Sequence, residues 1–259
     1  MKKIQKFVLV LLAASVVMLT SCGSKDPENA APAPTPQTTS TTTTTTPSYN
    51  VPGAYINEFP FATQDDENED SWEYSACGAF CMAYYLAIKG YFPKDKIKEQ
   101  AQIFYNKIKF TGEAASYFGE YSDPVKIATE IAPYVEEAEF RMNTSRTSYD
   151  ESSTEEKAEY ILCELKDDLG IQGVVNAPVF ADALAENEYV IEIVVPSNDV
   201  NTGDPLRYGL HYVLTYKKNN TLYTLDPFIG TEYPREGFKT GTPYSVCFCN
   251  GGLFFTPKN

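Results

Sequence analysis

The 259-residue sequence contains a single histidine, His211, so any site that needs an imidazole must use this residue. Basic residues are also scarce, because 21 Lys and Arg stand against 35 Asp and Glu, which gives a formal net charge of −14. A surface with this excess of acid repels polyanions. The charge therefore excludes nucleic acid as a partner, and it disfavours binding to anionic lipid surfaces.

Long hydrophobic runs are lacking. The apolar run from Phe7 to Leu19 is too short to span a bilayer permanently, and it follows three lysines. This order is typical of a secretory signal peptide. Its end, Leu19-Thr20-Ser21-Cys22, resembles a bacterial lipobox. The resemblance implies cleavage after residues 1–21, acylation of Cys22 by a fatty acid such as palmitate, and anchoring to a membrane of the cell envelope.

Residues 22–50 contain almost nothing to bury. They are rich in Pro, Ser and Thr and include a threonine run from Thr41 to Thr46, a composition that does not offset the entropy lost on ordering. We expect a lipidated Cys22 followed by a disordered tether. The acidic stretch Ser24 to Glu28 is either a surface-export signal or a plain polar linker. Residues 51–259 then have the size of one domain with its own core. Without the signal peptide the chain has 18 basic and 35 acidic residues, a net charge of −17.

The six cysteines leave an odd number once Cys22 is lipidated, so at least one thiol stays free or pairs between molecules. The pairing of Cys81, Cys163, Cys247 and Cys249 stays open. A zinc site built from Cys77, Cys81, Cys247 and Cys249 has spacings that fit structural zinc motifs badly. The acidic run from Asp65 to Asp70 lacks the glycine and the terminal glutamate of a calcium-binding EF-hand loop. The sequence therefore predicts no metal and no cofactor.

Helical patterns dominate the first part of the domain. From Cys77 onward, apolar and small residues recur so that one face of a helix is buried, and a second helix follows Pro93 with Ile97, Ala101, Ile103 and Phe104 on its period. A loop is expected from Gly112 to Tyr121. Further helices are predicted from Asp123-Pro124, from the capping box Ser153 to Glu156 as far as about Leu169, and from Val179 to Glu186.

The pattern changes to short β-branched and aromatic runs near the end of the chain, and the residues from Lys217 to Asn220 are typical of a tight hairpin turn. Helices followed by antiparallel strands predict an α+β domain. The expected strands are Tyr189 to Val195, Leu210 to Tyr216, Thr221 to Leu225, Tyr244 to Phe248 and Leu253 to Thr256.

Three residues suit nucleophilic catalysis. Cys77 stands at the start of a predicted helix, where unpaired backbone amides and the helix dipole favour a thiolate. His211 lies in a predicted strand and Asp226 ends the next one, so antiparallel pairing brings them within reach if the register allows. An imidazole beside a thiol acts as its base, and a carboxylate behind the imidazole fixes its tautomer.

These residues resemble the papain-like cysteine peptidases of the bacteriocin-leader-processing type. The resemblance rests on Phe59-Pro60-Phe61-Ala62-Thr63-Gln64, Cys77-Gly78, Gly209-Leu210-His211-Tyr212-Val213 and Asp226-Pro227. It implies a papain-like fold and a peptide or protein substrate. In this family Cys77 would be the nucleophile, His211 the general base and acid, Asp226 the orienting carboxylate, and Gln64 a donor to the oxyanion. The chain departs from the family at Ala79, where members usually have proline, and in its longer helical section.

Two other hypotheses stay open. A papain-like lipoprotein without turnover would bind or adhere rather than hydrolyse, since a fold does not guarantee function. A transglutaminase-like domain shares the order of Cys, His and Asp-Pro, but Cys81 would then open the helix. Taken singly, Cys77 is also compatible with inert packing, and His211 with a structural role. The sequence does not identify the substrate or the oligomeric state.

Overall fold

The computed structural model describes residues 61–64, 71–146, 148–149, 153–176, 184–196, 210–228, 230–235 and 246–258. The expected signal peptide, the lipidated Cys22, the tether and the acidic run 65–70 lie outside the described residues. So does most of the helix expected at residues 179–186.

Within the described residues, seven strands form one sheet in the order β2-β1-β7-β3-β4-β5-β6. Neighbouring strands are antiparallel, except that β2 pairs with β1 in parallel. Together with the helices, this sheet confirms the α+β class. The strands are β1 (Val135–Met142), β2 (Val175–Asn176), β3 (Tyr189–Pro196), β4 (His211–Lys218), β5 (Thr221–Asp226), β6 (Thr231–Pro234) and β7 (Val246–Pro257).

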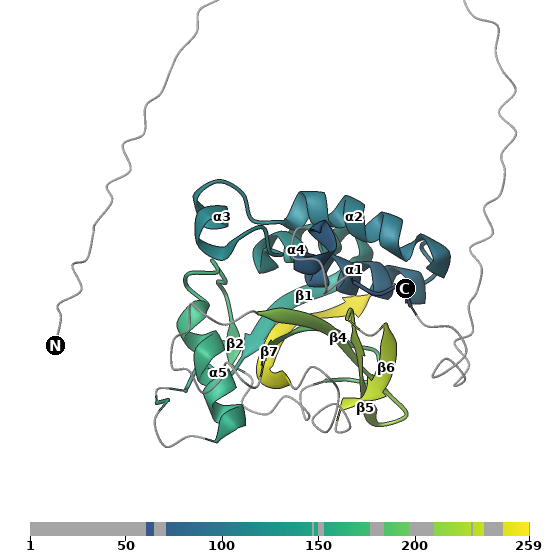
Figure 1. Ribbon diagram of the computed structural model, residues 1–259. Coiled ribbons are helices and arrows are strands. Elements are labelled where there is room, and N and C mark those ends of the chain that lie inside the picture. Colours follow the sequence, from purple (N-terminus) through teal and green to yellow (C-terminus); the bar gives the residue numbers. More distant parts are fainter. Residues whose placement is uncertain are drawn as a thin grey trace, which may run out of the picture. The chain divides into compact units, whose positions relative to one another are not determined.

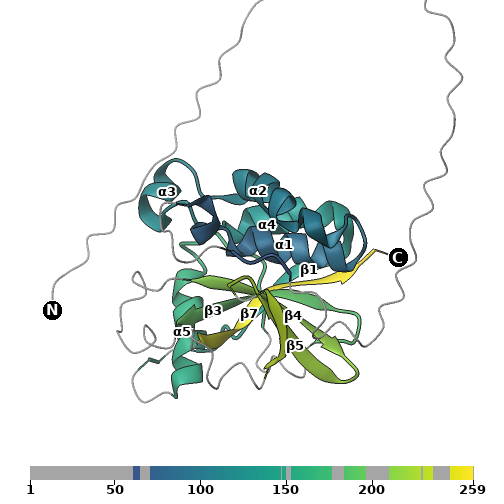
Figure 2. The same ribbon diagram turned by 45° about the vertical axis from the view of Figure 1, so that its right-hand side comes forward.

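Four of the described helices gather on one side of the sheet, whereas the fifth, α5, lies at one end of it and packs mainly against β7 (Figures 1 and 2). Helix α1 is the central one, because it contacts β3 and β4 of the sheet and also α2 and α4 of the helical layer. The helices are α1 (Cys77–Ile88), α2 (Ile97–Ile108), α3 (Glu113–Phe118), α4 (Pro124–Ile131) and α5 (Thr154–Leu165).

Helix α1 is buried on all sides, since every residue from Cys77 to Ala87 is buried. The expectation of a single buried face is therefore wrong: the helix lies between the sheet and the other helices, so both of its faces are covered. Because Gly78 has no side chain, α1 can pack close to α4 and to the residues just before it. A Cβ atom on residue 78 would lie 2.6 Å from the side chain of Ile127 and 2.8 Å from that of Ser122.

The predicted helix signals are largely confirmed. Asp123 caps α4 by accepting hydrogen bonds from the backbone N–H groups of the first turn, and Pro124 opens the helix. Ser153 and Glu156 form the predicted capping box of α5. That helix ends at Leu165, earlier than expected.

Three expectations in the first helical section need correction. The second helix starts only at Ile97, after a short 3-10 turn over Lys94–Lys96. Ile103 lies on its outer face, with 45 % of its surface exposed, rather than in the core. The predicted loop from Gly112 to Tyr121 contains the short helix α3.

The sheet also differs from the prediction. Strand β1 lies within the section expected to be helix-rich, and four consecutive residues of this strand are exposed. The two short strands expected near the end of the chain are one long strand, β7, and β6 was not predicted. The tight turn between β4 and β5 is confirmed, because Asn219 and Asn220 both have positive φ angles, 51° and 61°.

Candidate functional site

Cys77 is the first residue of α1. Its N-cap residue, Ala76, offers no side-chain hydrogen bond, and the first turn contains no acidic residue. The positive end of the helix dipole therefore acts on Cys77 without compensation from a side chain, which favours a negative charge at this position. Cys81 lies one turn further on, so the helix start required by the transglutaminase-like hypothesis is not at Cys81.

The β4–β5 hairpin brings His211 and Asp226 together, as the predicted strands allowed. Nε2 of His211 lies 2.8 Å from Oδ1 of Asp226, and both side chains are buried. A polar contact further along the hairpin holds the register: the hydroxyls of Thr215 and Thr224, which face each other across the strands, are 3.0 Å apart. Thr215 also donates a 2.9 Å hydrogen bond to the buried carboxylate of Glu192.

Cys77 acts on the His211 ring through its charge and a hydrogen bond. Burial alone would lower the pKa of His211, but the charge of Asp226 and hydrogen bonds with Asp226 and Cys77 raise it from 6.5 to about 10. His211 is thus held as an imidazolium between a carboxylate and a sulfur. We call Cys77, His211, Asp226 and Gln64 the Cys77 site.

The raised pKa of His211 predicts that the protein loses stability in alkaline solution. A group whose pKa is higher in the folded than in the unfolded state stabilises the fold fully below pH 6.5, and this contribution is lost as the pH rises through about 10. We expect the free energy of unfolding to fall across this range by at most about 1.4 kcal/mol per pH unit. Chemical denaturation at several pH values measures the slope. The slope should be smaller in Asp226→Asn, and equal slopes in both proteins would contradict the assignment.

Gln64 belongs to a short segment fixed between the helix and the hairpin. Its backbone N–H donates to the carbonyl of Pro227 at 2.8 Å, and its side-chain Nε2 donates to the carbonyl of Tyr74 at 2.6 Å. The hydroxyl of Tyr84, on α1, donates to the carbonyl of Ala62 at 2.7 Å. Gln64 is therefore tied both to the residues before Cys77 and to the turn after Asp226.

The turn that follows Asp226 requires a glycine. The backbone N–H of Gly230 donates to the carbonyl of Asp226 at 2.8 Å, and Phe61 donates from its N–H to the carbonyl of Gly230 at the same distance. Gly230 has a φ angle of 59°, and a Cβ atom there would lie 2.3 Å from the carbonyl oxygen of Phe61. The Gln64 segment can thus approach the hairpin this closely because residue 230 has no side chain.

Two buried acceptors in the Cys77 site accept no hydrogen bond. They are Oε1 of Gln64 and Oδ2 of Asp226. Native proteins rarely leave such atoms unsatisfied, and functional sites are among the places where they do.

The Cys77 site is closed. Only 2 % of the surface of Cys77 and 5 % of that of His211 are exposed, so a substrate needs an opening movement to reach the sulfur. Burial raises the pKa of Cys81, as do the nearby Cys77 and Asp226, which keeps Cys81 a neutral thiol. Within the described residues, Cys77, Cys81 and Cys163 form no disulfide.

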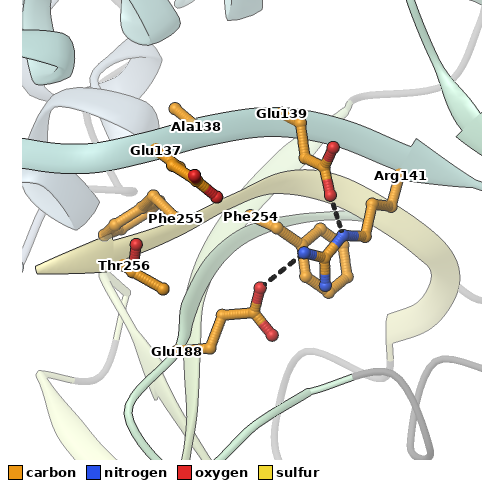
Figure 3. Close-up of a pocket in the computed structure, with 8 residues that line it drawn as sticks. All are labelled: Glu137, Ala138, Glu139, Arg141, Glu188, Phe254, Phe255 and Thr256. Carbon is orange, nitrogen blue, oxygen red and sulfur yellow. Dashed lines mark hydrogen bonds and ion pairs between the residues drawn. The ribbon is translucent and has the colours of Figure 1, made fainter.

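A pocket of about 320 Å³ lies elsewhere, on β1 and β7 (Figure 3). Arg141 points into it and bridges Glu139 and Glu188 at N–O distances of 2.6 and 2.7 Å, with its guanidinium 4.6 Å from the centre of the Phe254 ring. Because this arginine is already paired with two carboxylates, the pocket offers no free positive charge. It shares no residue with the Cys77 site.

Metal and membrane features were searched for in the part of the chain that the structure describes. No three His, Cys, Asp or Glu side chains there come together as metal ligands. No helix there has the length and apolar character needed to cross a membrane.

Comparisons with protein-family models, curated proteins and solved structures gave no match to this chain.

The structure brings His211 and Asp226 together, and it adds two residues that sequence reasoning missed. Phe228 stacks on the ring of His211, and Tyr84 anchors the Gln64 segment. The position of Phe228 directly after Asp226-Pro227 was a signal, because it keeps residue 228 close to the carboxylate that contacts His211. The sequence holds no signal that would identify the partner of Tyr84.

Proposed function

We propose that this protein is a cysteine hydrolase of the papain-like type that cleaves peptide bonds through a thioester intermediate. The observation that carries the proposal is the position of His211, which interacts with Asp226 through Nε2 and also with Cys77. The order of the chain, with a nucleophile helix first and an antiparallel sheet after it, supports a papain-like architecture.

The chemistry follows from the three side chains. The Cys77 thiolate attacks the peptide carbonyl carbon and forms a C–S bond, and the electron pair of the carbonyl moves to its oxygen. One N–H of the Gln64 amide is used by Tyr74, and the second is available to the developing oxyanion, together with the backbone N–H of Cys77. The His211 imidazolium then gives its proton to the leaving amine, and the C–N bond breaks.

Water completes the cycle. Neutral His211 takes a proton from a water molecule, whose oxygen attacks the thioester carbonyl, and the C–S bond breaks to release a carboxylic acid and the thiolate. Asp226 keeps the ring of His211 oriented through both steps, because its carboxylate holds Nε2. Every proton that moves in this scheme passes through one imidazole.

The closure of the site favours a second candidate. With Cys77 only 2 % exposed, the same arrangement suits a protein that retains a peptidase scaffold but binds peptides without turnover. Incubation of the purified chain with a peptide library, followed by mass spectrometry, separates the two. New peptide termini that disappear in Cys77→Ala support hydrolysis, whereas saturable retention of intact peptides without new termini supports the binding protein.

We also propose that the protein is exported and tethered to a membrane of the cell envelope through an acylated Cys22. The motif at residues 19–22 carries this proposal. Cells grown with radioactive palmitate should label the protein, and Cys22→Ser should abolish the label and release the protein from the membrane fraction. Equal labelling of the two proteins would contradict the anchor.

A further inference from the structure

Phe228 contacts two members of the Cys77 site at once. Its ring is stacked on the imidazole of His211, with the ring centroids 4.3 Å apart and the planes inclined by 10°. Its backbone N–H donates a 2.9 Å hydrogen bond to Oδ1 of Asp226. This is the oxygen that also interacts with Nε2 of His211. One residue thus contacts both the ring and the carboxylate that orients it.

The position of Phe228 follows from the hairpin. Leu214 of β4 pairs with Leu225 of β5, so the end of β5 lies beside the start of β4. The chain then turns, and the hydrogen bond from the N–H of Gly230 to the carbonyl of Asp226 closes this turn, which contains Phe228. The stack is therefore a consequence of the hairpin and of the turn that follows Asp226.

We infer that Phe228 is a positioning residue for the proposed hydrolysis: it fixes the plane of the His211 ring and shields the His211–Asp226 contact from water. The inference rests on the proposed function. A stacked ring opposes rotation of the imidazole about χ2, so Nε2 stays on Asp226 and the ring keeps its hydrogen bond with Cys77. It also keeps water from competing for Oδ1 of Asp226, and a hydrogen bond in a drier environment is electrostatically stronger.

The test compares Phe228→Leu, which removes the ring, with Phe228→Tyr, which keeps it. An aromatic stack is worth about 0.5 to 1.5 kcal/mol, so we expect Phe228→Leu to slow alkylation of Cys77 by iodoacetamide about tenfold, as followed by mass spectrometry of the Cys77 peptide. In peptide hydrolysis kcat should fall by a similar factor with little change in KM. The tyrosine variant should restore both rates to within about twofold.

Two controls separate positioning from general packing. Phe118→Leu makes the same change in α3, where Phe118 stacks on Phe110 with ring centroids 4.9 Å apart, and it should leave the alkylation rate unchanged. NMR of histidine-labelled protein shows one imidazole only, and Phe228→Leu should move its titration midpoint to lower pH. Should the leucine variant fail to fold, Phe228→Met provides the same comparison with a longer, unbranched side chain that adapts more easily to the space.

The outcomes are distinct. Unchanged titration and alkylation in Phe228→Leu, or an equal loss in Phe118→Leu, overturns the inference. Failure of tyrosine to restore the rates overturns it too, because the effect would then come from packing. If no peptide is hydrolysed even by the unmodified protein, but the titration and alkylation effects are present, the proposed function fails while the positioning role of Phe228 stands.

Discussion

Replacement of Cys77 by alanine should abolish both peptide hydrolysis and labelling by a peptide electrophile, whereas Cys81→Ala should keep both. The two cysteines lie one turn apart in the same buried helix, so they form a matched pair. They differ in surroundings: Cys77 stands at the helix start beside His211, and Cys81 is a buried thiol whose pKa is raised by burial. We expect hydrolysis to fall by at least about 10³-fold in Cys77→Ala, since removal of a nucleophile leaves only the contribution of binding and the oxyanion donors.

The label must be assigned to its residue, because the protein has other free thiols. Cys163 is partly exposed and will react with general thiol reagents, so the modified peptide should be identified by mass spectrometry. Labelling of the two variants to the same extent would remove Cys77 from the nucleophile role. Loss of labelling in Cys81→Ala alone would transfer that role to Cys81.

His211→Ala should reduce kcat/KM by about 10³-fold, because this imidazole is the base that acts on Cys77 in the proposed reaction and the only imidazole of the sequence. Asp226→Asn should have a smaller effect, since the amide keeps the volume and an oxygen acceptor but loses the charge that favours the imidazolium. Glu139→Gln removes one carboxylate away from the site and serves as the control. The measurement is kcat/KM for peptide hydrolysis by each of the three variants, compared with the unmodified protein.

Two results would contradict the roles assigned to His211 and Asp226. Turnover that survives His211→Ala unchanged would show that the assignment of the base is wrong. An equal loss in Asp226→Asn and Glu139→Gln would show that the effect is one of overall charge and not of contact with the ring.

Sequence signals predicted the structure correctly where the interactions join residues that are close together in the chain. Asp123-Pro124 and the capping box of Ser153 and Glu156 predicted helix starts, because these side chains bond to backbone groups within one turn. The turn at Asn219 and Asn220 was predictable for the same reason. The predicted hairpin placed His211 and Asp226 on neighbouring strands, and in the structure their side chains are 2.8 Å apart.

Features set by tertiary packing were not predictable in this way. Strand β1 carries exposed glutamates such as Glu137 and Glu139, a pattern without a strand signal, and it is a strand because β7 pairs with it. The burial of α1 on all sides depends on helices that follow it in the chain. The stack of Phe228 on His211 depends on a register that the sequence permits but does not specify.

The contact between Cys77 and His211 is the central claim, and the titration of the single imidazole tests it most directly. NMR of histidine-labelled protein should give one imidazole resonance that titrates near pH 10 in the unmodified chain and at lower pH in Cys77→Ala, because Cys77 contributes to the raised pKa of His211. A midpoint near 6.5, or the same midpoint in both proteins, would show that the ring of His211 does not meet the sulfur.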